Sequence, residues 1–342
     1  MRILITGSAG FVGSNLADKF LSNGAEVTIF DNLSRRGVEK NLDWLNKKHG
    51  NVNFVKGDIR NASDIGAVMK DIDAVFHCAA QTAVTTSVKD PTEDFEINAR
   101  GTFNVLEAAR RSRSNPKVIY TSTNKVYGNN VNAIALQEKE KRYEFSDRKF
   151  AAGIPENFPT DASEHTPYGC SKYAGDLYMR DFFEIYGLPT VTLRMSCIYG
   201  THQYGCEDQG WVAHFIISSI FGKPLTIYGD GKQVRDILFI DDLVGFIELA
   251  AENINRTKGQ VYNIGGGVKN TISLLELLDM LKRLGIDSKY SFSGWRPADQ
   301  KVYVSDISKA AALGWSPSVK PEDGIKRLAL WVKENRGLFN GV

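Results

Sequence analysis

The first thirteen residues, Met1-Arg2-Ile3-Leu4-Ile5-Thr6-Gly7-Ser8-Ala9-Gly10-Phe11-Val12-Gly13, decide the fold of this chain. Residues 3–6 form an apolar run that predicts a buried strand, and residues 11–23 show the periodicity of an amphipathic helix. Three glycines join the two elements with the spacing G-x-x-G-x-x-G. Glycine lets the backbone turn tightly and approach a pyrophosphate, which the positive N-terminal end of the next helix attracts. The stretch therefore predicts a dinucleotide-binding strand, turn and helix.

The rest of the first half repeats this alternation. Strand-like runs lie at residues 26–30, 52–56, 74–77, 118–121 and 191–194, with amphipathic stretches between most of them. Such alternation predicts an α/β fold, a doubly wound parallel sheet that binds its ligand beyond the carboxyl ends of the strands. We expect this domain to span residues 1–194, with a return at about 234–264.

The remainder of residues 195–342 predicts a smaller C-terminal α/β lobe. Glycine and proline interrupt its pattern, and helices are expected near residues 211–221, 243–253 and 273–284. The polar stretch 129–166 has no clean periodicity, which is typical of a functional or disordered loop.

Composition excludes several classes of protein. The chain has 342 residues, 42 Lys+Arg and 40 Asp+Glu, so it lacks the excess of basic residues that nucleic-acid binding requires. Its four cysteines show no C-x-x-C spacing, which argues against a metal site or a disulfide framework. The first apolar run is too short for a signal peptide, and no run reaches the length of a membrane helix. We therefore expect a cytoplasmic protein without metal, membrane or nucleic-acid partners.

Acidic residues at predicted strand ends indicate which dinucleotide is bound. Asp31 ends the second strand, where a carboxylate accepts hydrogen bonds from the adenosine ribose. A carboxylate there favours NAD over NADP, although the nearby Arg35 and Arg36 could accommodate a 2′-phosphate. On the same logic Asp58 and Ile59, after the third strand, are expected to flank the adenine.

Two side chains suggest acid–base chemistry. Tyr168 and Lys172 open an amphipathic stretch at i,i+4 spacing, which places a phenol and an ammonium on one helix face. Because a nearby cation favours the phenolate, and a positive nicotinamide ring would act in the same direction, Tyr168 is expected to act as a base at neutral pH. Tyr228 and Lys232 have the same spacing, but two intervening glycines predict a turn there. A packed aromatic with a solvated lysine is the structural alternative for the first pair.

Hydroxyl groups cluster after the predicted strand 118–121, at Thr121, Ser122 and Thr123. This end of a doubly wound sheet faces the cofactor, so a hydroxyl there can hydrogen-bond a reacting sugar oxygen and share in its proton transfer. Serine and threonine at a strand end also serve simply as turn residues.

With these residues assembled, the chain resembles the nucleotide-sugar epimerases of the extended short-chain dehydrogenase/reductase family over nearly its whole length. Besides the motifs above, the resemblance rests on these segments: Asp31-Asn32, Asp58-Ile59-Arg60, His77-x-Ala79-Ala80, Asn98-x-x-Gly101-Thr102, Gly229-x-Gly231-x-Gln233-x-Arg235-Asp236 and Arg296-x-x-Asp299-Gln300. It implies a Rossmann domain, tightly bound NAD, a nucleotide-sugar-binding C-terminal lobe, and a homodimer or higher homo-oligomer formed through residues 95–110 and 168–186.

The resemblance also implies roles for individual residues. Tyr168 would be the catalytic base, Lys172 would hold the nicotinamide ribose, and Thr123 would hydrogen-bond the reacting hydroxyl. NAD would be bound by Gly7, Gly10, Phe11, Val12, Gly13, Asp31, Asn32, Ser34, Arg35, Asp58, Ile59, Ala79, Ala80, Gln81, Asn98, Thr121, Ser122, Tyr168 and Lys172. The substrate would be bound by Thr123, Asn124, Gln209, Gly210, Gln233, Arg235 and Arg296, the last two on its pyrophosphate.

The residues after Thr123 separate the reactions of this family. Its 4,6-dehydratases carry an Asp-Glu pair there, whereas this chain has Asn124-Lys125, and an amide cannot protonate a leaving hydroxyl. Dehydration is therefore disfavoured, and decarboxylation likewise, because a glutamate is missing soon after Thr123. The nearest likeness within the family is to enzymes that invert C2 of CDP-hexoses, of the CDP-paratose, CDP-tyvelose or CDP-glucose type. It rests on Asp31-Asn32-Leu33-Ser34-Arg35, Ser122 to Gly128, the insertion before Pro167, and Asp208-Gln209-Gly210-Trp211-Val212.

The sequence leaves alternatives open. Nothing derived from the residues alone chooses cytosine over uracil or C2 over C4, so a UDP-sugar 4-epimerase remains the second hypothesis, ahead of a 4,6-dehydratase. Cys197 stands where many 4-epimerases have an asparagine, which weakens transfer of their substrate contacts. A non-catalytic protein that senses NAD is a further alternative, although such proteins tend to lose the tyrosine–lysine pair that this chain keeps.

Overall fold

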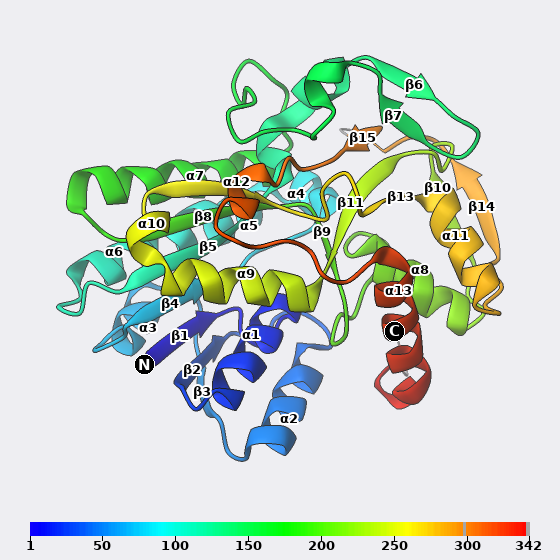
Figure 1. Cartoon of the computed structure of the whole chain (residues 1–342). Helices are drawn as coiled ribbons and strands as arrows, with labels where there is room; N and C mark the ends of the chain where they lie inside the picture. The colour runs from blue at the N-terminus through cyan, green and yellow to red at the C-terminus, as the bar shows by residue number, and fades with distance from the viewer. Residues whose placement is uncertain (297–298, 340–342) are drawn as a thin grey trace. The chain divides into compact units, whose positions relative to one another are not determined.

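The computed structural model describes residues 1–296 and 299–339 and divides the chain into two compact units (Figure 1). Unit 1 comprises residues 1–126, 166–194 and 244–262, and unit 2 comprises residues 127–165, 195–243 and 263–342. Residues 127–165, which the sequence pattern assigned to the first domain, thus belong to unit 2. The chain returns to unit 1 at residue 244, whereas the sequence pattern placed this return at about residue 234.

Unit 1 is built on a seven-stranded sheet of strand order β12-β8-β5-β4-β1-β2-β3. Its strands are β1 (Arg2–Thr6), β2 (Glu26–Asp31), β3 (Asn53–Lys56), β4 (Ala74–His77), β5 (Lys117–Thr123), β8 (Thr190–Met195) and β12 (Gln260–Ile264). The register is parallel in the pairs β1–β2, β1–β4, β2–β3 and β4–β5. All six strands predicted for this half are present, and the order reverses at β1. The doubly wound fold is therefore confirmed.

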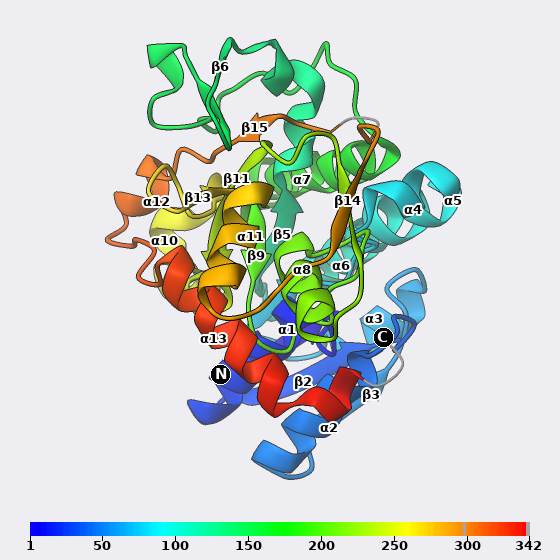
Figure 2. The same ribbon diagram turned by 90° about the vertical axis from the view of Figure 1, so that its right-hand side faces the viewer.

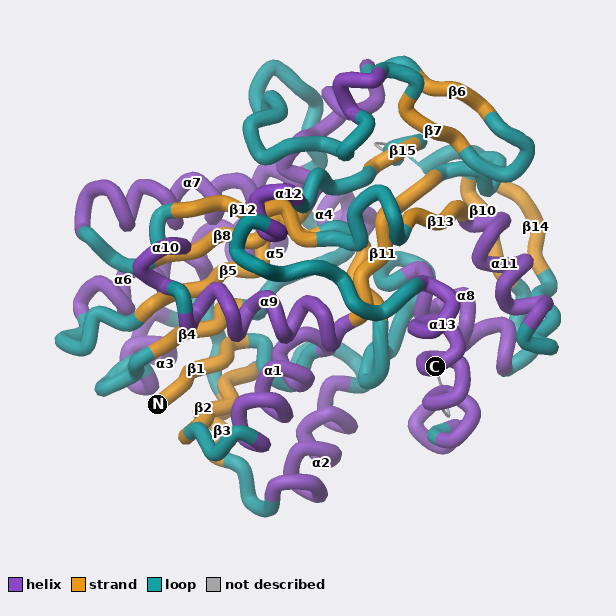
Figure 3. The backbone as a smooth tube through the Cα atoms, viewed as in Figure 1, coloured by secondary structure: helices purple, strands orange, loops and turns teal. Residues whose placement is uncertain are grey.

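Helices cover both faces of this sheet (Figure 3). They are α1 (Phe11–Ser22), α2 (Val38–His49), α3 (Ala62–Val68), α4 (Val84–Lys89), α5 (Pro91–Phe95), the π-helix η1 (Glu96–Arg100), α6 (Gly101–Arg111), α7 (Pro167–Tyr186), α9 (Ile240–Glu252) and α10 (Ile254–Thr257). Neighbouring strand residues point to opposite faces. Phe76 accordingly stacks on Phe20 of α1, whereas Val75 joins the cluster beneath α3, α6 and α7.

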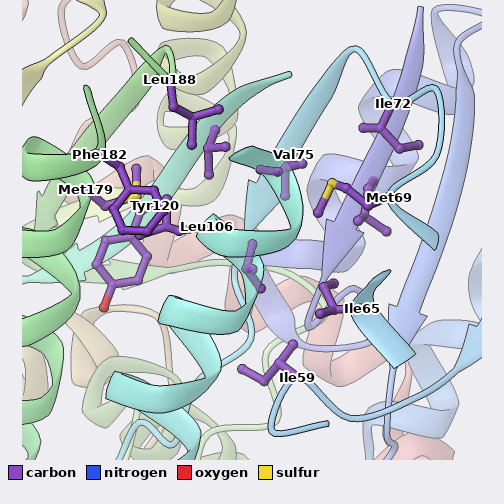
Figure 4. Close-up of a cluster of buried hydrophobic side chains, with 14 of the residues drawn as sticks. Ile59, Ile65, Met69, Ile72, Val75, Leu106, Tyr120, Met179, Phe182 and Leu188 are labelled. Carbon is purple, nitrogen blue, oxygen red and sulfur yellow. The ribbon is translucent and has the colours of Figure 1, made fainter. Parts of the chain in front are cut away.

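That second cluster is a dry hydrophobic core (Figure 4). Leu4, Val75 and Val118 supply its strand side, and Leu106 of α6 and Met179 of α7 its helix side, all without exposed surface. Helix α7 approaches β5 closely because residue 175 is glycine: a Cβ there would lie 2.6 Å from the Tyr120 hydroxyl. Burial of this core therefore fixes α7 against the carboxyl half of β5.

Unit 2 contains small sheets. Strand β11 (Val234–Phe239) pairs with β9 (Cys197–Tyr199), β13 (Thr271–Ser273) and β15 (Val302–Tyr303), and β10 (Leu225–Tyr228) pairs in parallel with β14 (Tyr290–Ser293), which Figure 2 shows beside α11. Its helices are η2 (Asn124–Ala133), η3 (Arg148–Phe150), α8 (Trp211–Ile220), α11 (Leu274–Arg283), α12 (Ser308–Ala311), α13 (Pro321–Glu334) and η4 (Arg336–Phe339). The helices predicted near 211–221, 243–253 and 273–284 thus correspond to α8, α9 and α11.

The stretch 129–166, which had no periodicity, is an ordered part of unit 2. It forms the antiparallel pair β6 (Leu136–Glu138) and β7 (Tyr143–Phe145), and Phe158 packs edge-on against the buried Tyr127. Short elements held by aromatic contacts carry no sequence period, which is why the pattern gave no signal here. Throughout the described ranges 1–296 and 299–339, no helix combines the length and apolarity that crossing a bilayer requires.

Candidate active site

The glycine loop forms a cradle between β1 and α1. Gly7 has a positive φ of 68°, and a Cβ on it would lie 2.5 Å from the backbone nitrogen of Ala79. A Cβ on Gly13 would collide with the backbone of Gly7 and come within 2.6 Å of Ser8 Cα. Helix α1 has Gly10 at its N-cap, no side-chain cap and no acidic residue in its first turn. The loop therefore admits no side chain at two positions and leaves the positive end of α1 open to an anion.

Asp31 lies beside this cradle at the end of β2. Its two carboxylate oxygens accept hydrogen bonds from the backbone N–H groups of Ala9, at 3.0 Å, and Leu33, at 2.8 Å. Burial raises the pKa of this carboxyl, and the backbone donors oppose that rise. Arg35 donates to Thr82 Oγ1 at 2.8 Å, so the arginine that could have served a 2′-phosphate already has a partner in this structure.

The neighbouring acidic residue, Asp58, is part of an ionic cluster. Asp58 accepts from Asn32 Nδ2 at 3.0 Å and forms a 2.7 Å ion pair with Arg60, which lowers the pKa of Asp58 to about 2. Asn32 in turn accepts from the backbone N–H of Ser34 at 3.0 Å. The Ile59 side chain lies in the hydrophobic core (Figure 4), so a contact of Ile59 with a cofactor would have to come from its backbone.

The ends of β4 and β5 lie next to the glycine loop. Ala79 touches Gly7, and beyond Ala80 the amide of Asn98 exchanges hydrogen bonds with the backbone of Gln81, at 2.9 and 3.1 Å. Thr121 Oγ1 donates to the His77 carbonyl at 3.0 Å. Within the described part of the chain, the buried hydroxyls of Ser8 and Ser122 make no hydrogen bond. The predicted cofactor residues of the strands therefore converge on one edge of the sheet.

Tyr168 and Thr123 are brought together at this edge. Tyr168 begins the first turn of α7, where the Thr166 hydroxyl accepts from the Gly169 N–H at 3.3 Å and Ser87 Oγ accepts from the Tyr168 N–H at 3.1 Å. A hydrogen bond between the phenol and Thr123 lowers the pKa of Tyr168, but burial outweighs it. The pKa of Tyr168 is consequently raised to about 12.

Lys172 lies one turn further along α7 and is 2% exposed. Its Nζ donates to the Thr121 carbonyl at 2.7 Å and lies 4.2 Å from the centre of the Tyr120 ring. Burial lowers the pKa of Lys172 to about 7, although the nearby carboxylates of Asp94 and Asp176 oppose the shift. The solvated-lysine alternative is thereby excluded, because this ammonium is enclosed at the carboxyl end of β5.

Burial opposes the effect that the i,i+4 spacing of Lys172 was expected to have on the Tyr168 phenol. We predicted a lowered phenol pKa from the i,i+4 spacing, whereas the structure raises it. The physical reason is that burial penalises the phenolate more than the nearby groups favour it. Burial thus favours the protonated phenol, and a further positive charge beside it would favour the phenolate.

Apart from Thr123 and Asn124, which belong to unit 1, the candidate substrate residues lie in unit 2. Arg235 donates to the Val234 carbonyl at 2.8 Å and to Asp299 at 2.7 Å, and Gln233 donates to the Tyr228 carbonyl at 2.6 Å. Arg296 stacks on the Tyr228 ring at 4.0 Å and lies 3.4 Å from a carboxylate oxygen of Glu207.

The nearby loop that carries Gln209 is closed by backbone bonds to Cys206, and Gly210 follows it with a φ of 76° at the start of α8. Tyr228 ends β10 and is followed by a turn with positive φ at Gly229 and Gly231, so the second tyrosine–lysine match is not helical, as expected. Asn124 is buried immediately after Thr123 at the end of β5.

Two residues beside Tyr168 and Lys172, Asp94 and Ser171, escaped the sequence analysis. Asp94 of α5 is fully buried, and its carboxylate accepts from Ser171 Oγ at 2.5 Å; Ser171 is the residue before Lys172. The available sequence signal was an aspartate four residues before Asn98, a spacing that places the two side chains on the same helical face.

These residues fit NAD. The cradle would collide with any Cβ at Gly7 or Gly13, the N-terminus of α1 is open, and Asp31 stands at the end of β2 where a ribose hydroxyl would donate. The unpartnered hydroxyls of Ser8 and Ser122 lie along the same edge.

Comparison with known proteins gives matches over the whole chain. The profile of the NAD dependent epimerase/dehydratase family matches residues 3–265. The chain is 44% identical over 340 residues to the CDP-paratose 2-epimerase of Salmonella typhi, covering 97% of this chain and 99% of that protein. It is similar in structure to UDP-glucuronic acid 4-epimerase from Bacillus cereus in complex with UDP-glucuronic acid and NAD (TM-score 0.82, 31% identity, 98% and 99% coverage). It is also similar to UDP-glucose 4-epimerase of Thermotoga maritima with UDP-glucose (TM-score 0.80, 30% identity, 98% and 100% coverage).

Proposed function

We propose that this chain, which belongs to the NAD dependent epimerase/dehydratase family, inverts C2 of a CDP-hexose of the CDP-paratose, CDP-tyvelose or CDP-glucose type. The chain is an NAD-dependent nucleotide-sugar epimerase. The observation that carries the choice of C2 and cytidine is the 44% identity to CDP-paratose 2-epimerase over 97% of the chain. The motifs at Ser122 to Gly128 and at Asp208 to Val212 point to the same group.

Unit 1 would hold the cofactor. We assign the pyrophosphate to the cradle of Gly7, Gly10 and Gly13, and the adenosine ribose to Asp31. When bound, NAD supplies the acceptor and donor of a hydride at the sugar stereocentre and, while oxidised, a positive charge. Side chains of the protein would orient the sugar and move the proton of its reacting hydroxyl.

The protein's part is proton transfer at one hydroxyl. We assign Tyr168 to take the proton of that hydroxyl and later to return it. Thr123, which hydrogen-bonds the phenol, would keep the hydroxyl in line with it. Lys172 would donate from its enclosed position to the nicotinamide ribose and favour the phenolate electrostatically. Because burial raises the pKa of Tyr168, the positive charge of oxidised NAD would add to that of Lys172 in favouring the phenolate.

The residues after Thr123 favour epimerisation over dehydration. Asn124 is 8% exposed at the end of β5, and its amide cannot donate a proton to a departing hydroxyl. Loss of water would need an acid at that place. Return of the hydride is therefore the favoured fate of a sugar oxidised at the reacting carbon.

Unit 2 would hold the nucleotide. Arg235 and Arg296 are the two guanidinium groups assigned to the pyrophosphate, a ligand that matches their planar donors. Both are paired with carboxylates, Asp299 and Glu207, so the pyrophosphate would replace one anionic partner with another.

Substrate choice tests the proposal. Purified enzyme would be incubated separately with CDP-paratose, CDP-tyvelose, CDP-glucose and UDP-glucose, and the configuration at C2 and C4 followed by NMR. We expect inversion at C2 of at least one CDP-sugar and none at C4 of UDP-glucose. Turnover of UDP-glucose alone would assign the chain to the 4-epimerases, which are its structural neighbours. The 4,6-dehydratase hypothesis would require a 4-keto-6-deoxy product.

We further propose a homodimer. Apolar side chains of α6 and α7 are exposed on unit 1, notably Phe103 at 38%, Leu177 at 47% and Ile185 at 65%. Light scattering on the purified protein, with Leu177→Glu as the disrupting variant, would check this. The cytoplasmic location, inferred from cysteine usage, stays a prediction.

A further inference from the structure

The buried carboxylate of Asp94 has no role in the mechanism so far, although it lies between the segments that carry it. One oxygen accepts from Ser171 Oγ at 2.5 Å. The other accepts from Gln81 Nε2 at 2.9 Å and from Asn98 Nδ2 at 3.1 Å. The group therefore joins α7 to the loop after β4 and to the π-helix η1, three segments that contain candidate cofactor or catalytic residues.

The link to α7 acts on the turn between the two catalytic side chains. Ser171 lies three residues after Tyr168 and directly before Lys172, and its hydroxyl is also 3.2 Å from the Tyr168 carbonyl. A hydrogen bond to a carboxylate is shorter and stronger than one between neutral groups. The turn is thus held by an ionic acceptor anchored on another helix, 77 residues away in the sequence.

The backbone around Asp94 supports such an anchor. Residues 91–111 run through α5, η1 and α6, with a π-helical turn at Glu96–Arg100 in which Asn98 lies. A π-helical turn inside a helix is less stable than α-helix and is found mostly where it orients a functional group. Here it accompanies the hydrogen bonds of Asn98 to Gln81 and Asp94.

The negative charge of Asp94 also acts on the Lys172 ammonium. Ionisable groups around that ammonium come from four elements: Asp94 from α5, Asp176 from α7 itself, Cys78 after β4, and Tyr120 from β5. His77 is held neutral by burial, with a pKa lowered to about 3, and Cys78 by a thiol pKa raised to about 12.

Of the two carboxylates in this group, Asp176 already has a cation. Its Oδ2 lies 2.7 Å from Arg194 Nε, and both side chains are less than 5% exposed. Within residues 1–296 and 299–339, no arginine forms an ion pair with Asp94. The cation that lowers the pKa of Asp94 is Lys172. Of these two carboxylates, Asp94 is therefore the one that is not already paired with an arginine and that can stabilise the Lys172 ammonium.

We propose that Asp94 is a positioning residue of the epimerase reaction, which holds the Tyr168–Lys172 turn through Ser171 and provides the counter-charge of the buried Lys172 ammonium. This inference rests on the proposed function for its catalytic consequence but not for its electrostatic one. Burial raises the pKa of Asp94, and the hydrogen bonds from Ser171 and Gln81 and the charge of Lys172 oppose that rise, so the contacts that position the turn also favour the ionised carboxylate.

The test replaces the charge and keeps the shape. In Asp94→Asn the negative charge is lost, so the pKa of Lys172 and that of Tyr168 should both fall, and both limbs of the pH profile of kcat should move to lower pH. A structural role alone would lower kcat without moving the profile. Asp90→Asn is the matched control, because Asp90 is an exposed cap of the same helix α5, and asparagine caps equally well. We expect its profile to coincide with that of the wild type.

A second readout needs no substrate. Lysine labelled with ¹³C at Cε would be followed by NMR in the full-length protein, with and without added NAD, and the Lys172 signal assigned from Lys172→Met. The wild-type signal should titrate near the pKa of about 7, and in Asp94→Asn it should titrate lower by about half to one pH unit. An unchanged Lys172 titration in folded Asp94→Asn, together with an unmoved profile, would overturn the proposal.

Ser171→Ala separates positioning from charge and serves if Asp94→Asn does not fold. This variant keeps the Asp94 carboxylate but removes the Ser171 hydroxyl that donates to it from α7. We therefore expect kcat to fall about tenfold with KM nearly unchanged. Wild-type kcat in this variant would refute the positioning role. If the wild type turned over none of the CDP-sugars, the proposed function would fail, while the lysine titration would still decide whether Asp94 is the counter-charge.

Discussion

The ammonium of Lys172 donates a 2.7 Å hydrogen bond to the backbone carbonyl of Thr121, which ties a buried cation on α7 to the carboxyl end of β5. The cation is directed at the strand end, where the cofactor residues converge, and the phenol is left protonated by burial.

Tyr168→Phe should lower kcat by about 10²–10⁴-fold and leave NAD bound, because the ring packs as before while the proton acceptor is gone. Epimerisation is measured by NMR, and bound NAD by its release on denaturation. Tyr178→Phe, on the exposed face of the same helix, should keep wild-type activity. Unchanged turnover in Tyr168→Phe would revive the hypothesis of a non-catalytic NAD-binding protein.

Lys172→Met should abolish efficient turnover yet stabilise the cofactor-free protein. Burial lowers the pKa of Lys172 from 10.5 to about 7, so between these pH values the unfolded chain carries a proton that the folded one lacks. Wild-type stability therefore rises with pH across this window, and the advantage of the variant is largest below about pH 7. We expect its melting temperature to be about 2–4 °C higher there, from calorimetry, for each kcal/mol relieved. A difference independent of pH would contradict the buried ammonium.

Gly7→Ala should lose bound NAD, since the new Cβ would lie 2.5 Å from the Ala79 nitrogen and shift the cradle. Gly24→Ala is the matched control: Gly24 also has a positive φ, of 76°, but a Cβ added there would meet no atom within 4 Å. Both variants should lose roughly 1 kcal/mol of stability through backbone strain, and only Gly7→Ala should also suffer the steric collision. NAD content after purification distinguishes them, and equal retention would remove the cradle from cofactor binding.

Arg296→Lys should raise KM for the nucleotide sugar about tenfold and change kcat little, because a point charge replaces a planar pair of donors on the pyrophosphate. Steady-state kinetics over a range of substrate concentrations would show this. Arg283→Lys, an exposed arginine of α11, should match the wild type. A loss confined to kcat would place Arg296 at the reacting sugar instead.

Deuterium at the inverted carbon should remain in the product. Oxidation and reduction by the same bound NAD return the same hydrogen, whereas removal as a proton would exchange it with water. Mass spectrometry of the product formed from a C2-deuterated substrate measures the retention. The enzyme should also need no added NAD, because the cofactor is regenerated in each turnover, and dependence on external NAD would argue against this cycle.

Local patterns were sufficient for much of the molecule. The strand, glycine turn and helix at residues 3–23 lie within one short segment, so periodicity and glycine spacing specified them correctly. The same holds for α7, whose start at Pro167 follows from a threonine cap and a proline at its first position. By contrast, residues 129–166 fold through contacts with distant parts of unit 2, and no local signal announced them.

The amino-acid sequence alone determined the doubly wound fold, the glycine cradle and the identity of Thr123, Tyr168 and Lys172, because each is written in spacings of a few residues. Only the tertiary structure decided the pKa values of these side chains and which residues hold them in place. A pKa depends on how completely the surrounding chain removes water and on which charges it brings near. Asp94 and Ser171 are 77 residues apart and share one hydrogen bond because α5 packs on α7. Such contacts arise from packing, which no local spacing can reveal.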